Sequence, residues 1–332
     1  MLRLRGLLFV VVLLFASLAV MTSCGGSAHD SDEHYVFIAA NIQVPYWDAA
    51  GAGFNKAGDE MKVKTDFSGP KSYDPKKEQE AMEDAIAAKA SGILIAVTDA
   101  ALLKSSIDKA IAAGIPVITL DSDAPDTKRL FFIGTNNYQV GVAGGKRLAK
   151  AMGGKGNVVV YTMPAQPNLQ DRLRGYKDAL AGTAIKIERE VDIQGDPRIA
   201  FDTTEKIVGA KDKVDAFVCL EAQSGKEVAE VLDRYKVKGK VVMAMDTDPD
   251  TLQWIQKDGI EATIAQKPYT MAFVGLQMLD NLHHHKPPAL DTDWLTDSFA
   301  PIPSFVDTGS ALIDKANVST FLQAKQSATG NH

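Results

Sequence analysis

From Tyr35 onward, short apolar runs alternate with longer segments in which apolar residues recur every three or four positions. The short, β-rich runs predict strands, and the spacing in the longer segments predicts helices. In the first half the predicted strands are Tyr35–Ala40, Lys64–Phe67, Gly92–Ala96, Pro116–Leu120 and Phe131–Gly134, and the predicted helices are Tyr46–Lys62, Pro75–Ala90 and Leu102–Ala113. Largely apolar strands separated by helices indicate a parallel sheet that is covered on both faces.

The same alternation repeats from Asn137 onward. The predicted helices are Asn137–Met152, Asn168–Leu180, Arg198–Gly209, Ser224–Tyr235, Asp248–Asp258 and Pro268–His283. The predicted strands are Val158–Tyr161, Ile185–Val191, Ala216–Cys219, Val241–Met245 and Ala262–Ile264. Two cycles of similar length predict an α/β protein with two doubly wound parallel-sheet lobes. Because no low-complexity linker separates the cycles, we expect short crossings between the lobes.

The N-terminal segment sets the expected compartment. Two early arginines precede the apolar stretch Leu7–Val20, which predicts a secretory signal peptide over residues 1–23 and is too short to span a membrane comfortably. The following Met21-Thr22-Ser23-Cys24 resembles a bacterial lipobox, which implies that Cys24 becomes the first mature residue and carries a lipid. The alternative is a plain signal peptide cleaved near the same place. The small and polar residues after Cys24 predict a tether over 24–34.

Composition excludes several classes of protein. The chain has 332 residues, of which 45% are apolar, so disorder is excluded as its main state and the chain is long enough for two cores. A net charge of −6 argues against a nucleic-acid binder. The run His283–His285 points in different directions on a helix, and the chain contains no recognisable zinc, nucleotide or nucleophile motif. The sequence therefore predicts no metal, no cofactor and no enzymatic activity.

Polar and aromatic residues recur where the predicted strands end, which is where ligands bind in open α/β sheets. They are Tyr46, Trp47 and Asp121 in the first half, and Arg172, Asp196, Glu221, Asp246 and Gln266 in the second. Carboxylates accept hydrogen bonds from hydroxyl groups, a guanidinium donates them, and aromatic faces cover the apolar side of a sugar ring. The set favours a polyhydroxylated ligand. Taken singly, each residue could instead be a helix cap, a turn residue or part of the core.

Motifs in matching order support a family resemblance. They are Asn41–Trp47, Ile115–Asp121, Arg172–Tyr176, Ala262–Gln266, and Val306–Thr308 together with Asn317–Val318. From Tyr35 to about Phe321 the chain resembles the type I periplasmic solute-binding proteins of sugar ABC transporters, the ribose-binding-protein-like family. The resemblance implies that Tyr46 and Trp47 stack on a sugar ring. It also implies that the ring hydroxyls are hydrogen-bonded by Asp121, Arg172, Asp246 and Gln266.

The chain departs from that family at three positions. Glu221 stands where the family often has asparagine, Asp196 where many members have a further aromatic residue, and Ser122 where ribose binders have arginine. Ribose specificity is therefore not carried over, and a pentose, a hexose, a polyol or a sugar-like furanone all remain open. We expect Arg174 to make a structural ion pair, which leaves Arg172 to face the ligand.

The resemblance also implies a hinge of three crossings, near Thr135–Asn136, Gln266–Lys267 and Asp307–Thr308. One lobe would then comprise residues 35–135 and 267–307, and the other residues 136–266 and 308–332. The expected protein is a monomer, anchored by the lipid on Cys24 in the periplasm or on the outer cell surface. It captures a monosaccharide or sugar-like ligand by hinge closure and delivers it to an ABC permease. The alternative is a sensory receptor of the same fold that signals to a membrane kinase or chemoreceptor.

Overall fold

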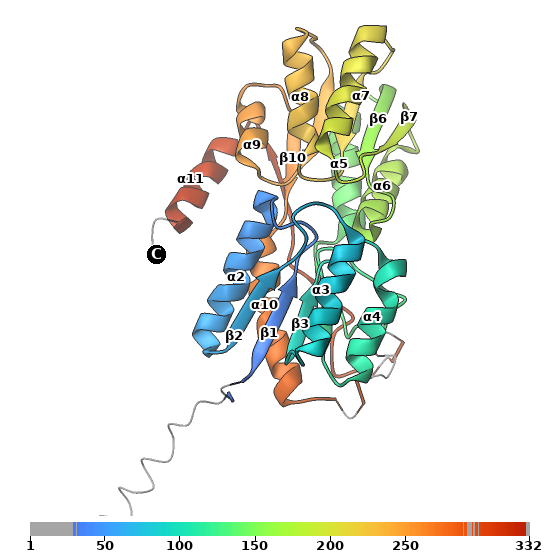
Figure 1. Ribbon diagram of the computed structural model, residues 1–332. Helices are drawn as coiled ribbons and strands as arrows, with labels where there is room; N and C mark the ends of the chain where they lie inside the picture. The colour runs from blue at the N-terminus through green and yellow to red at the C-terminus, as the bar shows by residue number, and fades with distance from the viewer. Residues whose placement is uncertain are drawn as a thin grey trace, which may run out of the picture. The chain divides into compact units, whose positions relative to one another are not determined.

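The computed structural model describes residues 29–30, 32–287, 289–290, 294, 296–297 and 299–329 (Figure 1). The chain divides into two compact units, Met1–Glu33 and His34–His332, and the helices and strands of the described residues belong to the second. The predicted signal peptide and the predicted lipidation site Cys24 lie outside the described residues. Among the described residues, every helix is too short or too polar to cross a membrane.

The first sheet has six parallel strands in the order β11-β5-β4-β3-β1-β2. Its strands are β1 (His34–Ile38), β2 (Lys64–Ser68), β3 (Gly92–Ile95), β4 (Val117–Leu120), β5 (Phe132–Gly134) and β11 (Phe305–Asp307). The helices packed with it are α2 (Pro45–Met61), α3 (Pro75–Ala87), α4 (Ala100–Ala112) and α10 (Pro268–His284). Helices α2 and α10 pack against each other, as do α3 and α4, so the central strands are buried on both faces.

The second sheet has six strands in the order β12-β10-β9-β8-β6-β7. Its strands are β6 (Lys155–Thr162), β7 (Ala184–Asp192), β8 (Ala216–Cys219), β9 (Val241–Met245), β10 (Ala262–Ala265) and β12 (Ala311–Asp314). The helices that follow its strands or precede them are α5 (Asn137–Ala151), α6 (Pro167–Leu180), α7 (Pro197–Ala210), α8 (Ser224–Arg234), α9 (Pro249–Gln256) and α11 (Val318–Thr329). Here α5 pairs with α6 and α7 with α8.

Local sequence signals explain where many of these helices begin. Proline occupies the first turn of α2, α3, α6, α7, α9 and α10, where its fixed φ suits a helix and its missing N–H is not needed. Asp74, Asp99 and Asn136 cap α3, α4 and α5 through side-chain oxygens that accept backbone N–H groups.

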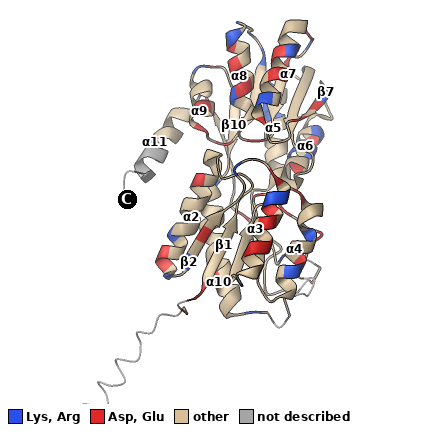
Figure 2. Cartoon of the chain, in the orientation of Figure 1, with Lys and Arg blue, Asp and Glu red and all other residues tan. Residues whose placement is uncertain are grey.

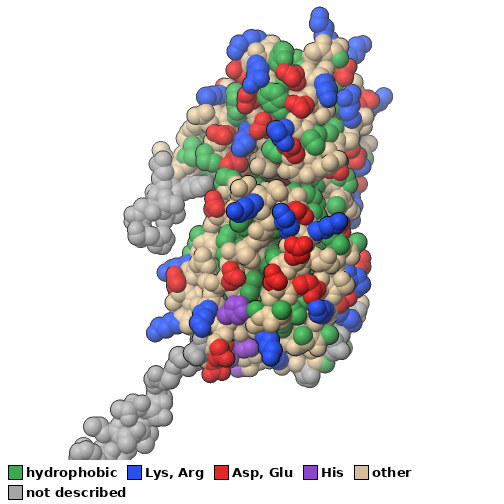
Figure 3. Space-filling model, viewed as in Figure 1, with side chains coloured by type: hydrophobic (Ala, Val, Ile, Leu, Met, Phe, Trp, Pro, Cys, Tyr) green, Lys and Arg blue, Asp and Glu red, His purple; other side chains and the backbone are tan. Residues whose placement is uncertain are grey.

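Charged residues of both signs lie along α3, α4, α7 and α8 (Figure 2) and intermix on the face shown in Figure 3. The prediction of two doubly wound α/β lobes is confirmed.

The C-terminal part of the chain is the one region that the sequence pattern did not resolve into elements. The chain passes between the sheets in three short segments, 135–136, 266–267 and 308–310, and the last of these joins β11 to β12. Ala311 pairs with Ala265, the last residue of β10, so β12 enters the second sheet at the end where its parallel strands finish. A strand that enters there must run against its neighbour. The second sheet is therefore mixed, with one antiparallel edge strand, and not wholly parallel as predicted.

Candidate ligand-binding site

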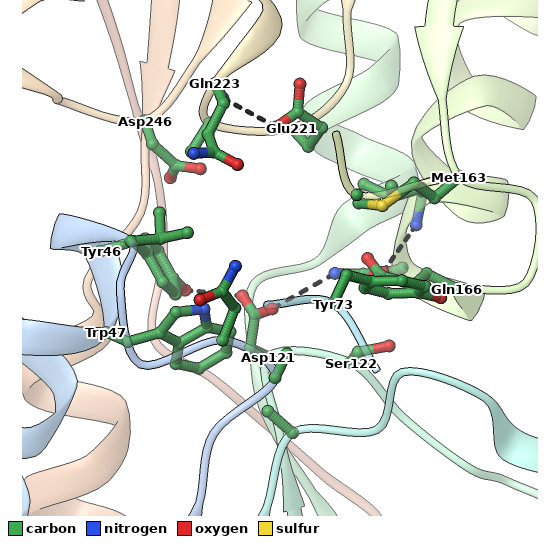
Figure 4. Close-up of a pocket in the computed structure, with 18 of the residues that line it drawn as sticks. Tyr46, Trp47, Tyr73, Asp121, Ser122, Met163, Gln166, Glu221, Gln223 and Asp246 are labelled. Atoms are coloured by element: carbon green, nitrogen blue, oxygen red, sulfur yellow. Dashed lines mark hydrogen bonds between the residues drawn. The ribbon is translucent and has the colours of Figure 1, made fainter. Parts of the chain in front are cut away.

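A cavity lies at the ends of the strands of both sheets (Figure 4), and its empty space, counted together with its opening to solvent, is about 660 Å³. Its lining includes the predicted residues Tyr46, Trp47, Asp121, Arg172, Glu221, Asp246 and Gln266. Asp121 and Asp246 approach it from different sheets, after β4 and β9.

Asp121 and Asp246 share an unusual backbone geometry. Their φ angles are 63° and 65°, in the left-handed region that Asp tolerates better than most residues. The N–H of Asp121 donates to the carbonyl of Ile133 at 3.0 Å, and the N–H of Asp246 donates to that of Ile264 at 2.9 Å. In each sheet the strand-end aspartate is thus tied to the neighbouring strand, and the sharp turn directs its carboxylate to the cavity.

The Asp121 carboxylate is held from both lobes. One oxygen accepts the Tyr46 hydroxyl at 2.6 Å, and the other accepts Asn168 Nδ2, from α6, at 3.3 Å. Burial raises the pKa of Asp121, while the charge of Arg172 and the Tyr46 hydrogen bond oppose that shift. Burial, and then the charge of Asp121, raise the pKa of Tyr46 well above its usual value. Tyr46 therefore remains a neutral donor beside an acceptor.

Arg172 is 2% exposed and organises the other side of the cavity. Its Nη2 donates to Gln266 Oε1 at 3.0 Å, its Nη1 to the carbonyl of Leu220 at 2.7 Å, and its Nε to Asn137 Oδ1 at 2.8 Å. Because Gln266 accepts from Arg172 through its oxygen, its amide nitrogen is turned toward Asp246 and donates to Oδ1 at 3.0 Å.

Asp246 is the most strongly perturbed carboxylate of the cavity wall. Burial raises its pKa to about 7, which Arg172 and the Gln266 hydrogen bond oppose and the charges of Asp121 and Glu221 reinforce. Its Oδ2 has no donor among the described residues, so a ligand hydroxyl could supply one. Arg174, two residues along α6, is exposed and pairs with Asp171 at 2.7 Å, which confirms its predicted structural role.

Glu221 lines the cavity, but its oxygens serve the helix that follows. They accept the backbone N–H groups of Gln223 and Ser224, each at 2.7 Å, and the Ser224 hydroxyl. The carboxylate thereby satisfies donors at the N-terminus of α8, where negative charge is favoured. Its capacity to accept hydrogen bonds from a ligand is correspondingly reduced.

Asp196 does not line this cavity, contrary to the prediction. It is the N-cap of α7, where its side chain accepts the N–H of Arg198 at 3.0 Å and pairs with the Arg198 guanidinium at 2.6 Å. That hydrogen bonding to Arg198 also lowers the pKa of Asp196. An aspartate directly before Pro197, which starts the helix, is placed to cap it, and capping turns the carboxylate toward its own helix.

Tyr46 and Trp47 line the cavity and also contact the first hydrophobic core. The rings of Tyr46 and Trp47 lie 4.9 Å apart in an edge-to-face arrangement and form one wall of the cavity. Trp47 is only 6% exposed and its ring is 6.3 Å from that of Phe37 in the first core. Trp47 is therefore a core residue as well as a wall residue.

Strand-end reasoning missed several residues of the lining: Tyr73, Met163, Gln166, Asn168 and Gln223. Most of them follow β2, β6 or β8, so the same rule, applied to every strand, would have found them. Ser122 is 3% exposed, and its hydroxyl has no partner among the described residues. A buried hydroxyl at the edge of a polar cavity is a group that a bound ligand can satisfy.

Comparison with known proteins agrees with this geometry. Residues 35–287 match the family profile described as the periplasmic binding protein domain. The ribose import binding protein RbsB of Haemophilus influenzae is 24% identical over 268 residues, which cover 80% of this chain and 89% of the relative.

Solved structures match over most of the chain. The arabinose-binding protein AraP of Geobacillus stearothermophilus has 30% identity and a TM-score of 0.72, covering 87% of this chain and 99% of its own. A chain of the XylFII–LytSN complex has 26% identity and a TM-score of 0.76, covering 86% and 98%. The matching family is one of binding proteins, as expected for a chain without enzymatic activity. The chain belongs to the periplasmic binding protein family, in its type I, ribose-binding-protein-like form.

Proposed function

We propose that this protein is an extracytoplasmic solute-binding protein that captures a monosaccharide or a sugar-like ligand and delivers it to an ABC importer. The observation that carries the proposal is the pair of buried strand-end carboxylates, Asp121 and Asp246, that face one cavity from two sheets beside an aromatic wall. Two of the relatives are a ribose import binding protein and an arabinose-binding protein, which supports the same class of ligand.

The cavity residues have separable roles in this proposal. Asp121 and Asp246 accept hydrogen bonds from ligand hydroxyls, Gln266 is oriented by Arg172, and the ring of Tyr46 covers an apolar face of the sugar, with Trp47 behind it. Glu221 contributes charge and shape to the wall. Because these groups come from both lobes, a ligand that contacts them stabilises the form in which the lobes meet. The proposed lobes are residues 35–135 with 267–307 and residues 136–266 with 308–332.

The proposal places the protein outside the cytoplasm. Residues 1–23 would be removed as a signal peptide, Cys24 would carry the lipid, and residues 24–34 would tether the binding unit to a membrane. Replacing Cys24 with serine is then expected to abolish incorporation of labelled palmitate and to release the protein from the membrane fraction. Labelling that persists in the variant would rule out this lipidation site.

A thermal-shift screen tests the proposed ligand class. A form starting at residue 25 is mixed with sugars, polyols and nucleosides at about 1 mM. A ligand at about a thousand times its dissociation constant adds about 4 kcal/mol to the free energy of unfolding, which is a shift of several degrees. We expect one or a few monosaccharides to give such a shift. A well-folded protein that responds to no sugar would contradict the proposal.

Acid is expected to weaken sugar binding while it stabilises the empty protein. The pKa of Asp246 is raised to about 7 in the folded empty protein, whereas the pKa of an aspartate in the unfolded chain is about 4. Between these two pH values the folded protein therefore binds a proton that the unfolded chain does not bind. Stability from this group therefore increases as the pH falls from about 7 to about 4. A sugar hydroxyl donates a stronger hydrogen bond to the ionised Asp246 carboxylate than to the protonated one, so affinity falls below pH 7, by at most about tenfold per pH unit.

Calorimetric titrations between pH 5 and pH 8, alongside melting curves without ligand, would measure the two opposite trends. The Asp246→Asn variant should bind more weakly at pH 8 and lose the step near pH 7. Burial raises the pKa of Glu78 to about 8, so this carboxyl also stabilises the empty protein as the pH falls, and only the difference between the wild type and Asp246→Asn isolates the contribution of Asp246. An affinity that is independent of pH would argue against a hydrogen bond from the ligand to an ionised Asp246.

A sensory receptor is the second candidate, because one structural relative was solved as the XylFII–LytSN complex, in which it is bound to another protein. Uptake of the identified sugar in a strain that lacks this gene separates the candidates. Loss of uptake supports delivery to an importer. Unchanged uptake with a lost transcriptional response to the sugar supports sensing.

A further inference from the structure

The side of the cavity away from Tyr46 and Trp47 contains a third aromatic residue. In Figure 4, Tyr73 lies there with Met163 and Gln166. Tyr73 belongs to the loop between β2 and α3 of the first sheet, yet it packs against the hydrophobic core of the second sheet. Tyr73 is thus a residue of one lobe whose side chain packs against the other lobe.

In the second lobe, Tyr73 packs against Gly195, which follows β7. A Cβ atom added to Gly195 would lie 2.1 Å from Tyr73 Cβ and 2.6 Å from its Cγ, distances at which one of the two residues must move. Gly195 also has a φ of 75°, in the left-handed region that disfavours other residues. The contact between the lobes at this point therefore depends on the absence of a side chain.

The hydroxyl group of Tyr73 is held by a hydrogen bond within its own lobe, to a residue that does not line the cavity. Its hydroxyl donates to the carbonyl of Thr98 at 3.0 Å, and the N–H of Thr98 donates to the buried carboxylate of Glu78 at 3.1 Å. The Thr98 hydroxyl contacts the same carboxylate. Because the tyrosine hydroxyl is directed at Thr98, the group that Tyr73 offers to a ligand is its ring.

We infer that Tyr73 is a specificity-determining residue of the sugar site, which closes the cavity opposite Tyr46 and couples ligand affinity to its fit against Gly195. The inference rests on the proposed function and extends it to the shape of the ligand. A cavity with aromatic rings on two sides selects a flat, ring-closed sugar that has C–H groups on both faces. An open-chain polyol of the same composition lacks that shape.

Two glycine variants test the contact with matched backbone strain. Gly239 has a φ of 76° and open space around its Cα, so Gly239→Ala introduces the left-handed strain without a clash. We expect Gly195→Ala to weaken sugar binding by about tenfold or more relative to Gly239→Ala, since overpacking at a tight contact is unfavourable. Affinity is measured by calorimetry on the purified protein with D-ribose, D-arabinose, D-glucose and D-galactose as probes.

A second set of variants keeps the inference testable if Gly195→Ala fails to fold. Tyr73→Phe retains the ring and should bind within about threefold of the wild type, whereas Tyr73→Leu should lose about tenfold, because one aromatic contact is removed. In a Tyr73→Gly background, Gly195→Ala should have little further effect, because the clashing Cβ is absent.

The outcomes separate the inference from the function on which it rests. If the wild type binds a probe sugar, and Tyr73→Leu and Gly195→Ala bind it as tightly as their controls, the role of Tyr73 is wrong and the function stands. If the wild type binds no sugar, neither these four nor any sugar of the thermal-shift screen, the proposed function and the inference fail together. Selective loss in both variants, with melting temperatures matched to the controls, supports the inference.

Discussion

Replacement of Arg172 with methionine is expected to reduce sugar affinity more than any other single change in the cavity, by about 100-fold or more. The guanidinium makes three hydrogen bonds, and one of them sets the orientation in which Gln266 donates to Asp246. Its charge also opposes the raised pKa of both aspartates. Its removal leaves two buried carboxylates without a compensating cation, which should lower the free energy of unfolding by about 3 kcal/mol.

The same helix provides a matched control for that experiment. Arg174→Met removes an exposed arginine that pairs with Asp171, and its effect on stability should be within about 0.5 kcal/mol. Denaturant titration and calorimetry of both variants compare the two arginines directly. Equal sugar affinities for the Arg172 and Arg174 variants would contradict the assigned role of Arg172.

Replacement of Trp47 with alanine is expected to reduce stability as well as binding. Its side chain is 6% exposed and packs against Phe37, so truncation leaves a cavity in the first core and lowers the free energy of unfolding by about 3–5 kcal/mol. The edge-to-face support of Tyr46 is lost at the same time, which should weaken sugar binding by about tenfold.

Trp254 is the corresponding control in the second lobe. It is partly exposed, lies outside the cavity lining and has Lys257 over its ring. Trp254→Ala should leave sugar affinity unchanged. Trp47→Phe should restore most of the stability that Trp47→Ala loses, as followed by thermal melting. Full stability of Trp47→Ala would show that this residue is not part of the first core.

The sequence was sufficient to predict the two α/β lobes because the central strands are apolar and most of them are followed by an amphipathic helix. It was insufficient for β11, β12 and α11. Strand β11 has three residues and β12 has four, and both are partly exposed, so their apolar runs are too short to predict strands. What makes them strands is pairing with β5 and β10, and that pairing depends on where the third crossing brings the chain.

The candidate site was predictable to the extent that it follows from strand ends. Asp121, Asp246 and Gln266 reach the cavity because they follow parallel strands directly. Asp196 also follows a strand, but the competing rule, that an aspartate before a helical proline caps the helix, decided its position. Tyr73 lies in the loop after β2, so the strand-end rule points to it, but its packing against the core of the other lobe is not encoded by any local pattern.

The edge strands β11 and β12 have a consequence for the order in which the protein is made. Residues 305–314 follow every other strand along the chain, and they complete one edge of each sheet. During synthesis from the N-terminus, both sheets therefore exist with an unpaired edge, at β5 and at β10, until this segment leaves the ribosome. Unpaired strand edges are sites where other chains can add. Neither lobe of the nascent protein is finished before the other, because β5 and β10 gain their last neighbouring strands within the same ten residues.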